Sequence, residues 1–168
     1  TPSQIGRPDT PLFISGEARA LAACRPVLES IAGNIMYMGE PIGNAAAWDL
    51  ATLSCMFGAM SGFFHGVRIC ESEGLKVDEF SKMIGAISPV LGEMIRSEGE
   101  DIHAGRYSEP ESSMATCANS GRLFVKQALE ARLDTSFPDF LMGLLDRALA
   151  AGYGNERLAA MIKVLRQP

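Results

Sequence analysis

The sequence lacks the residue patterns that mark several functional classes. Its four cysteines, Cys24, Cys55, Cys70 and Cys117, form no CxxC pair and lie beside neither histidine at metal-ligand spacing. We therefore predict reduced cysteines, no metal site and a cytoplasmic protein. The 15 basic residues are outnumbered by 20 acidic ones, which gives a net charge of −5 and no basic stripe. We therefore predict no nucleic-acid partner.

Two further patterns are missing. No positively charged segment followed by a short apolar run opens the sequence, so we expect no secretion signal. The glycine-rich GxGxxG turn, which holds the pyrophosphate of a dinucleotide after a first strand, is also absent. The chain alone is therefore expected not to bind a dinucleotide tightly.

The first forty residues read as one edge of an α/β domain. Short apolar runs at 12–14 and 35–38 predict two strands, and helical periodicity at 17–31 predicts a helix between them, with Pro26 ending or kinking it. Two strands and a crossover helix do not make a stable sheet alone. We therefore expect residues 1–40 to be the terminal piece of a larger domain.

From residue 41 onward the sequence predicts only helices, and hence a mainly α-helical domain at 41–168. The expected helices cover 42–72, a stretch from Asp78 that Pro89 kinks, 111–133, 138–151 and 155–165. The first is long and apolar enough for a membrane span. Its alanine, glycine and serine content instead favours a soluble helix that is buried on all sides, so we predict no membrane partner.

A lone carboxylate, Asp49, is the one formal charge between Ala45 and Gly66, except for His65 if protonated. Burying it costs many kcal/mol unless it is paired, protonated or used on a ligand. At 100° per residue it shares a helix face with Leu53, Met56 and Met60, whereas the glycine row that begins at Gly58 points away. This face is where a ligand pocket is expected, while the glycine row suits close helix packing.

Three segments together resemble a known family: YMGEPIGNAAAWDLATL, GFFHG and AGYGNERLAAMIKVLR. In this order they resemble the C-terminal portion of imine reductases and reductive aminases, NADPH-dependent relatives of the β-hydroxyacid dehydrogenases. The resemblance implies a long interdomain helix and a helical bundle like the C-terminal domain of 6-phosphogluconate dehydrogenase. It makes residues 1–40 the last strand-helix-strand piece of a Rossmann domain. It also implies a domain-swapped homodimer whose active sites lie between one Rossmann domain and the other subunit's helices.

The resemblance also implies site residues. The family's catalytic aspartate corresponds to Asp49, and the position eight residues later, commonly tyrosine or tryptophan, is Phe57, which carries no hydroxyl. Substrate contacts are predicted from the long helix and from 88–94 and 114–117 of the partner subunit. The predicted substrate-binding residues are Trp48, Leu53, Met56, Phe57, Met60, Met94 and Met114.

The function implied by the resemblance is NADPH-dependent reduction of an imine, or of a carbonyl compound plus an amine, with this chain as the dimerising and substrate-binding half. A carboxylate suits this reaction because an iminium is a cation. One alternative is a β-hydroxyacid-type dehydrogenase, which the absence of lysine between Ile42 and Gly74 disfavours. Another is a non-enzymatic dimerisation module with a merely buried Asp49, bonded to backbone or to an arginine. We expect the chain by itself to be a helical dimer without turnover.

Overall fold

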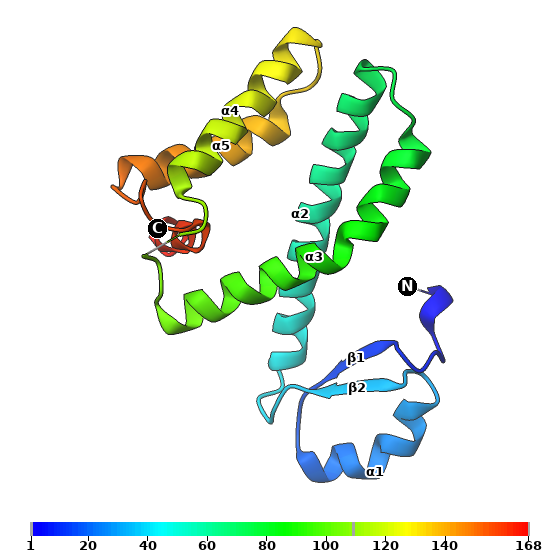
Figure 1. Ribbon diagram of the computed structural model, residues 1–168. Coiled ribbons are helices and arrows are strands. Elements are labelled where there is room, and N and C mark those ends of the chain that lie inside the picture. The colour runs from blue at the N-terminus through cyan, green and yellow to red at the C-terminus, as the bar shows by residue number, and fades with distance from the viewer. Residues whose placement is uncertain (1, 109, 168) are drawn as a thin grey trace. The chain divides into compact units, whose positions relative to one another are not determined.

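The protein is mainly helical, as predicted. The computed structural model describes residues 2–108 and 110–167, and Figure 1 shows the order of its helices and strands. The chain divides into two compact units, residues 1–60 and 61–168. The division into domains at residues 40 and 41 stays a prediction.

In the first unit, a parallel pair of strands is joined by a helix. Strand β1 (Pro11–Ile14) pairs with β2 (Asn34–Tyr37) through the crossover helix α1 (Ala18–Glu29), after a single 3-10 turn, η1 (Pro2–Gln4). The predicted strand-helix-strand order is thus confirmed. Pro26 lies inside α1 and does not end it, because the helix continues to Glu29.

Hydrogen bonds hold the beginning of the long helix α2 (Asn44–Ser72) against the ends of the strands. The Ser15 hydroxyl donates to the carbonyl of Ile42 at 2.6 Å and accepts from the backbone N–H of Ala45 at 3.2 Å. The Asn44 side chain donates to the carbonyl of Met38 at 2.7 Å. These bonds fix the first turn of α2 and therefore the place of Asp49 on its second turn.

Helix α2 is exposed rather than buried within its own chain. Of its described residues only Cys70 is buried, so this chain alone does not provide the predicted burial on all sides. By length and composition this helix could cross a membrane, a criterion that core helices of soluble proteins also meet. Its exposed large side chains include Trp48, Phe57 and Phe64.

In the second unit, the part of α2 that follows residue 60 forms a hairpin with α3 (Val77–Ala104). Gly74 takes a left-handed conformation, with a φ of +70°, where α2 gives way to the turn. The Phe63 and Phe80 rings stack at 5.5 Å, and a Cβ on Gly66 would lie 2.7 Å from Phe80. This glycine therefore allows the two helices their close approach. Helix α3 contains a proline at position 89 and bends part-way along in Figure 1, in agreement with the expected kink.

The hydrophobic core of the second unit lies among its last helices. Helices α4 (Met114–Glu130) and α5 (Ser136–Ala150) lie side by side as a hairpin in Figure 1. The core side chains come from these two helices and from the C-terminal segment: Met114, Ala118, Met142, Leu145, Ala148, Ala160 and Val164. The α4–α5 pair is therefore held together by apolar packing within the chain.

The last predicted helix is shorter than expected. The sequence predicts a helix from 155 to 165, but the segment begins with a 3-10 turn, η2 (Leu158–Ala160), followed by α6 (Met161–Leu165). Helix α4 likewise begins at Met114 rather than at Glu111. The two corrections have one cause: Ser113 and Arg157 form an antiparallel bridge, which holds both segments extended.

Candidate functional site

Asp49 projects from α2 as an exposed carboxylate. Among the described residues, its side chain makes no hydrogen bond or ion pair. The structure therefore does not show Asp49 as a buried acid paired with an arginine of the same chain. The carboxylate is available to a ligand or to another chain.

The predicted substrate-binding residues of α2 surround this carboxylate on one side of the helix. Because the segment is helical, Leu53, Met56 and Met60 lie on the same face as Asp49. Trp48 and Phe57 flank that face, and both are exposed, at 55% and 61%. Leu53 is partly buried, whereas the two methionines are exposed. The α2 face thus combines one charge with a broad apolar surface, and its contact with substrate stays a prediction.

The prediction that Met114 binds substrate does not agree with its buried position. Met114 is completely buried in the core formed by α4, α5 and the C-terminal segment. A side chain with no exposed surface cannot line a binding pocket without a rearrangement of that core. Its apolar character reflects packing at the first turn of α4.

A pocket in the second unit brings together two of the segments predicted to face substrate. This α3 pocket has a volume of about 390 Å³ and is lined by Val90, Glu93, Met94, Ser97, Glu98, Glu111, Ser112, Cys117, Arg157 and Leu158. Val90 and Met94 come from the predicted range 88–94, and Cys117 comes from the predicted range 114–117. The structure therefore places both ranges on one cavity, although the identity of its ligand stays a prediction.

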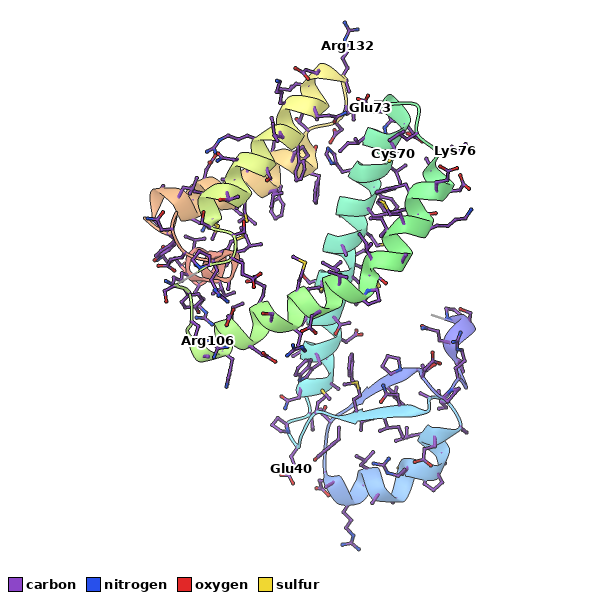
Figure 2. All side chains as sticks on the ribbon, in the orientation of Figure 1. Glu40, Cys70, Glu73, Lys76, Arg106 and Arg132 are labelled. Atoms are coloured by element: carbon purple, nitrogen blue, oxygen red, sulfur yellow. The ribbon has the colours of Figure 1, made fainter. Side chains whose placement is uncertain are left out.

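One residue that lines the α3 pocket, Arg157, belongs to an ion-pair network. Asp101, 5% exposed, accepts hydrogen bonds from Arg157 and from Arg106, the latter with Nε 3.0 Å from Oδ1. Burial alone would raise the pKa of Asp101, but the hydrogen bonds from the two arginines outweigh it and lower the pKa below its usual value. Figure 2 shows Arg106 at the end of α3. The network holds Arg157, which lines the pocket, against α3.

Sequence reasoning missed Glu98. Its Oε2 atom is buried and has no hydrogen-bond partner among the described residues, while the side chain as a whole is partly buried. A signal was present, because Glu98 lies three and four residues after Ile95 and Met94 and thus continues the apolar stripe of α3. Arg157 gave no such signal, since it reaches the pocket only through a contact between segments far apart in the sequence.

No metal centre accompanies these features. In residues 2–108 and 110–167, no group of three or more histidine, cysteine, aspartate or glutamate side chains could hold a metal ion. The described part of the chain also has free cysteines at all four positions, of which only Cys70, near the α2–α3 turn in Figure 2, is buried.

Comparison with known proteins identifies the family. A sequence model described as "NADPH-dependent reductive aminase-like, C-terminal domain" matches residues 41–167. The chain therefore belongs to this family. The fold class and the resemblance predicted from the sequence are both confirmed.

Three relatives illustrate the similarity. An NADPH-dependent reductive aminase of Aspergillus oryzae is 27% identical over 98% of this chain and 57% of its own length. The structure of a reductive aminase from Aspergillus terreus in complex with NADPH4, cyclohexanone and allyl amine is 27% identical, covers 99% of this chain and 57% of its own, and has a TM-score of 0.86. An imine reductase from Myxococcus stipitatus in complex with NADP+ shares the fold, with 23% identity, coverage of 99% and 58%, and a TM-score of 0.91. The chain thus spans less than three fifths of the length of these relatives.

Proposed function

We propose that the protein containing this chain reduces C=N bonds with NADPH, and that this chain supplies the substrate-binding and dimerising half. The observation that carries the proposal is Asp49, a carboxylate without a partner among the described residues, on a helix face rich in apolar and methionine side chains. The family membership and the ketone and amine bound by the Aspergillus terreus relative support an imine, or a carbonyl compound plus an amine, as substrate.

The chemistry assigns a clear task to this carboxylate. NADPH supplies the hydride when it is bound, and the Gly-rich turn that would hold its pyrophosphate is not among the residues of this chain. A protonated imine is a cation, so the Asp49 carboxylate stabilises it in a site from which water is excluded. The same oxygen atoms are able to accept or return the proton on nitrogen. Phe57, without a hydroxyl, leaves Asp49 as the proton-transferring group of this face.

The exposed apolar side chains of α2 and α3 support a homodimer. Large exposed residues include Trp48, Phe57 and Phe64 on α2, and Met83 and Leu91 on α3. Large apolar side chains left exposed in this way are typical of an interface. We propose that a second copy covers it by an intertwined exchange of helices, in which the α3 pocket of one subunit serves the Asp49 of the other. A cytoplasmic location likewise remains a proposal.

Removal of the Asp49 charge tests the function. In the full-length protein, Asp49→Asn keeps the size of the side chain but removes the anion, so kcat/KM for a preformed cyclic imine should fall at least about tenfold. In Asp49→Ala, kcat/KM should fall by as much or more, and sedimentation should show an unchanged dimer. Glu73→Gln, an exposed acid just beyond α2, is the matched control and should retain full turnover.

Two competing functions give different results in the same assays. A non-enzymatic dimerisation module, which the exposed apolar helices also suit, would show no imine reduction by the wild type. A β-hydroxyacid-type dehydrogenase would oxidise a panel of hydroxy acids with NADP+. If the wild type reduces imines and Asp49→Asn reduces them at the same rate, Asp49 has no part in the mechanism. The description of the fold would not change.

A further inference from the structure

The α3 pocket holds a carboxylate that the proposed chemistry at Asp49 does not use. Glu98 lines the pocket, and its Oε2 atom is buried without a hydrogen-bond partner among the described residues. Leaving a buried polar atom without a partner costs free energy, and more so when the atom carries charge. A hydrogen-bond donor brought in by a ligand would remove this cost.

The charges around the cavity determine which kind of donor fits. Among the described residues that line the pocket, Arg157 is the one basic side chain, and it is bound to Asp101, which lies outside the lining. Asp101 also binds Arg106, so these three groups together keep one positive charge. Against it, the lining contains three acids, Glu93, Glu98 and Glu111, of which Glu93 is bound by Arg96. The cavity consequently favours a cation over a neutral or anionic group.

Three of the uncharged lining residues have large apolar side chains. Val90, Met94 and Leu158 line the same cavity of about 390 Å³. Such a space accommodates a short aliphatic chain, and methionine adapts to chains of different shape. An alkyl chain that ends in an ammonium group would satisfy both the apolar walls and Glu98.

We propose that Glu98 is a specificity-determining residue, which makes the α3 pocket selective for substrates whose carbonyl or amine half carries an additional ammonium group. This inference rests on the proposed function, since it names the substrate class of the same site. The additional nitrogen is distinct from the nitrogen that is reduced: it donates a charge-assisted hydrogen bond to Glu98, while Asp49 faces the C=N bond.

The catalytic test uses the full-length protein and pairs of substrates of equal length, one ending in an ammonium group and one in a methyl group. The wild type should prefer the ammonium substrate by about tenfold or more in kcat/KM, and an otherwise equal carboxylate-ended substrate should be the poorest. Glu98→Gln should reduce the ratio of the two kcat/KM values to about one. Glu100→Gln, two residues further along α3 and outside the pocket lining, should keep the wild-type ratio.

A binding measurement separates this inference from the proposed function. Hexylammonium and hexanol are titrated calorimetrically into the full-length wild type and into Glu98→Gln. Tighter binding of hexylammonium that is lost in Glu98→Gln supports the inference even if no imine is reduced. Equal binding of the two probes by the wild type, or an ammonium preference that persists in Glu98→Gln, overturns it. In that case a tenfold effect of Asp49→Asn on neutral imines would still support the proposed function.

Discussion

The last helices of this chain and its two long helices differ in how far their apolar side chains are buried. Helices α4, α5 and α6 bury methionine, leucine and valine side chains in a core of their own. Helices α2 and α3 leave most of theirs exposed, with contacts such as the Phe63–Phe80 stack confined to the hairpin. The comparison teaches that one part of the chain provides its own hydrophobic core, whereas the other leaves most of its large apolar side chains exposed. The predictions below test this difference.

The largest effect is expected in the core of α4 and α5. Leu145, 2% exposed, packs in that core, so Leu145→Ala should lower the free energy of unfolding by about 2–5 kcal/mol. Leu123 on α4 is 63% exposed, and Leu123→Ala should cost less than about 1 kcal/mol. Urea unfolding at a fixed protein concentration measures both. Similar losses for the two variants would contradict a core located among the last helices.

A smaller effect is expected where α2 approaches α3. In Gly66→Ala the new Cβ would lie 2.7 Å from Phe80, whose ring cannot withdraw easily because it stacks on Phe63. Overpacking costs about 1–3 kcal/mol, which exceeds the ~1 kcal/mol gained when alanine replaces glycine in a helix. A net loss of stability is therefore expected. Gly143→Ala, where a Cβ on α5 meets nothing within 4 Å, is the control and should be about 1 kcal/mol more stable than the wild type.

The smallest effect is expected in the pH dependence of stability. Burial would raise the pKa of Asp101, but hydrogen bonds from Arg157 and Arg106 hold it below its usual value. As the pH falls, the unfolded state therefore binds more protons than the folded state. The stabilisation is present above the ordinary aspartate pKa of about 3.9 and is lost as the pH falls through the lower, folded-state pKa. Thermal unfolding between pH 6 and pH 3 should therefore show a weaker pH dependence in Asp101→Asn. The exposed Asp78→Asn should follow the wild type, and an identical slope for Asp101→Asn would contradict the proposed role of the network.

Local sequence patterns were sufficient for much of the fold. The spacing of apolar residues and the positions of proline and glycine predicted the strand-helix-strand piece, α2, α3 with its kink at Pro89, and the presence of α4 and α5. They failed where a contact between distant segments decides the backbone. The backbone N–H of Met114 donates to Glu156 at 2.7 Å, and that of Ala115 donates to Gly154 at 3.0 Å. These bonds hold residues 154–156 outside a helix, and no local pattern reveals them.

The candidate site shows the same division. Asp49 and its helix face could be predicted because they depend on the period of one helix. The exposure of α2 within this chain could not be predicted, because the apolar composition of a helix does not say whether its own chain or another one covers it. Met94 and Cys117 belong to two ranges that were predicted separately, and their meeting in one pocket with Glu98 and Arg157 required the tertiary structure.

A mixed dimer tests most directly the claim that Asp49 of one subunit works with the α3 pocket of the other. Full-length Asp49→Ala and Met94→Arg subunits, the second with its pocket filled by a charged side chain, are co-expressed with different tags and purified as the heterodimer. Each homodimer should be nearly inactive, whereas the heterodimer, which keeps one intact site, should recover about half of the wild-type imine reduction per dimer. A heterodimer no more active than its two parents would contradict the account.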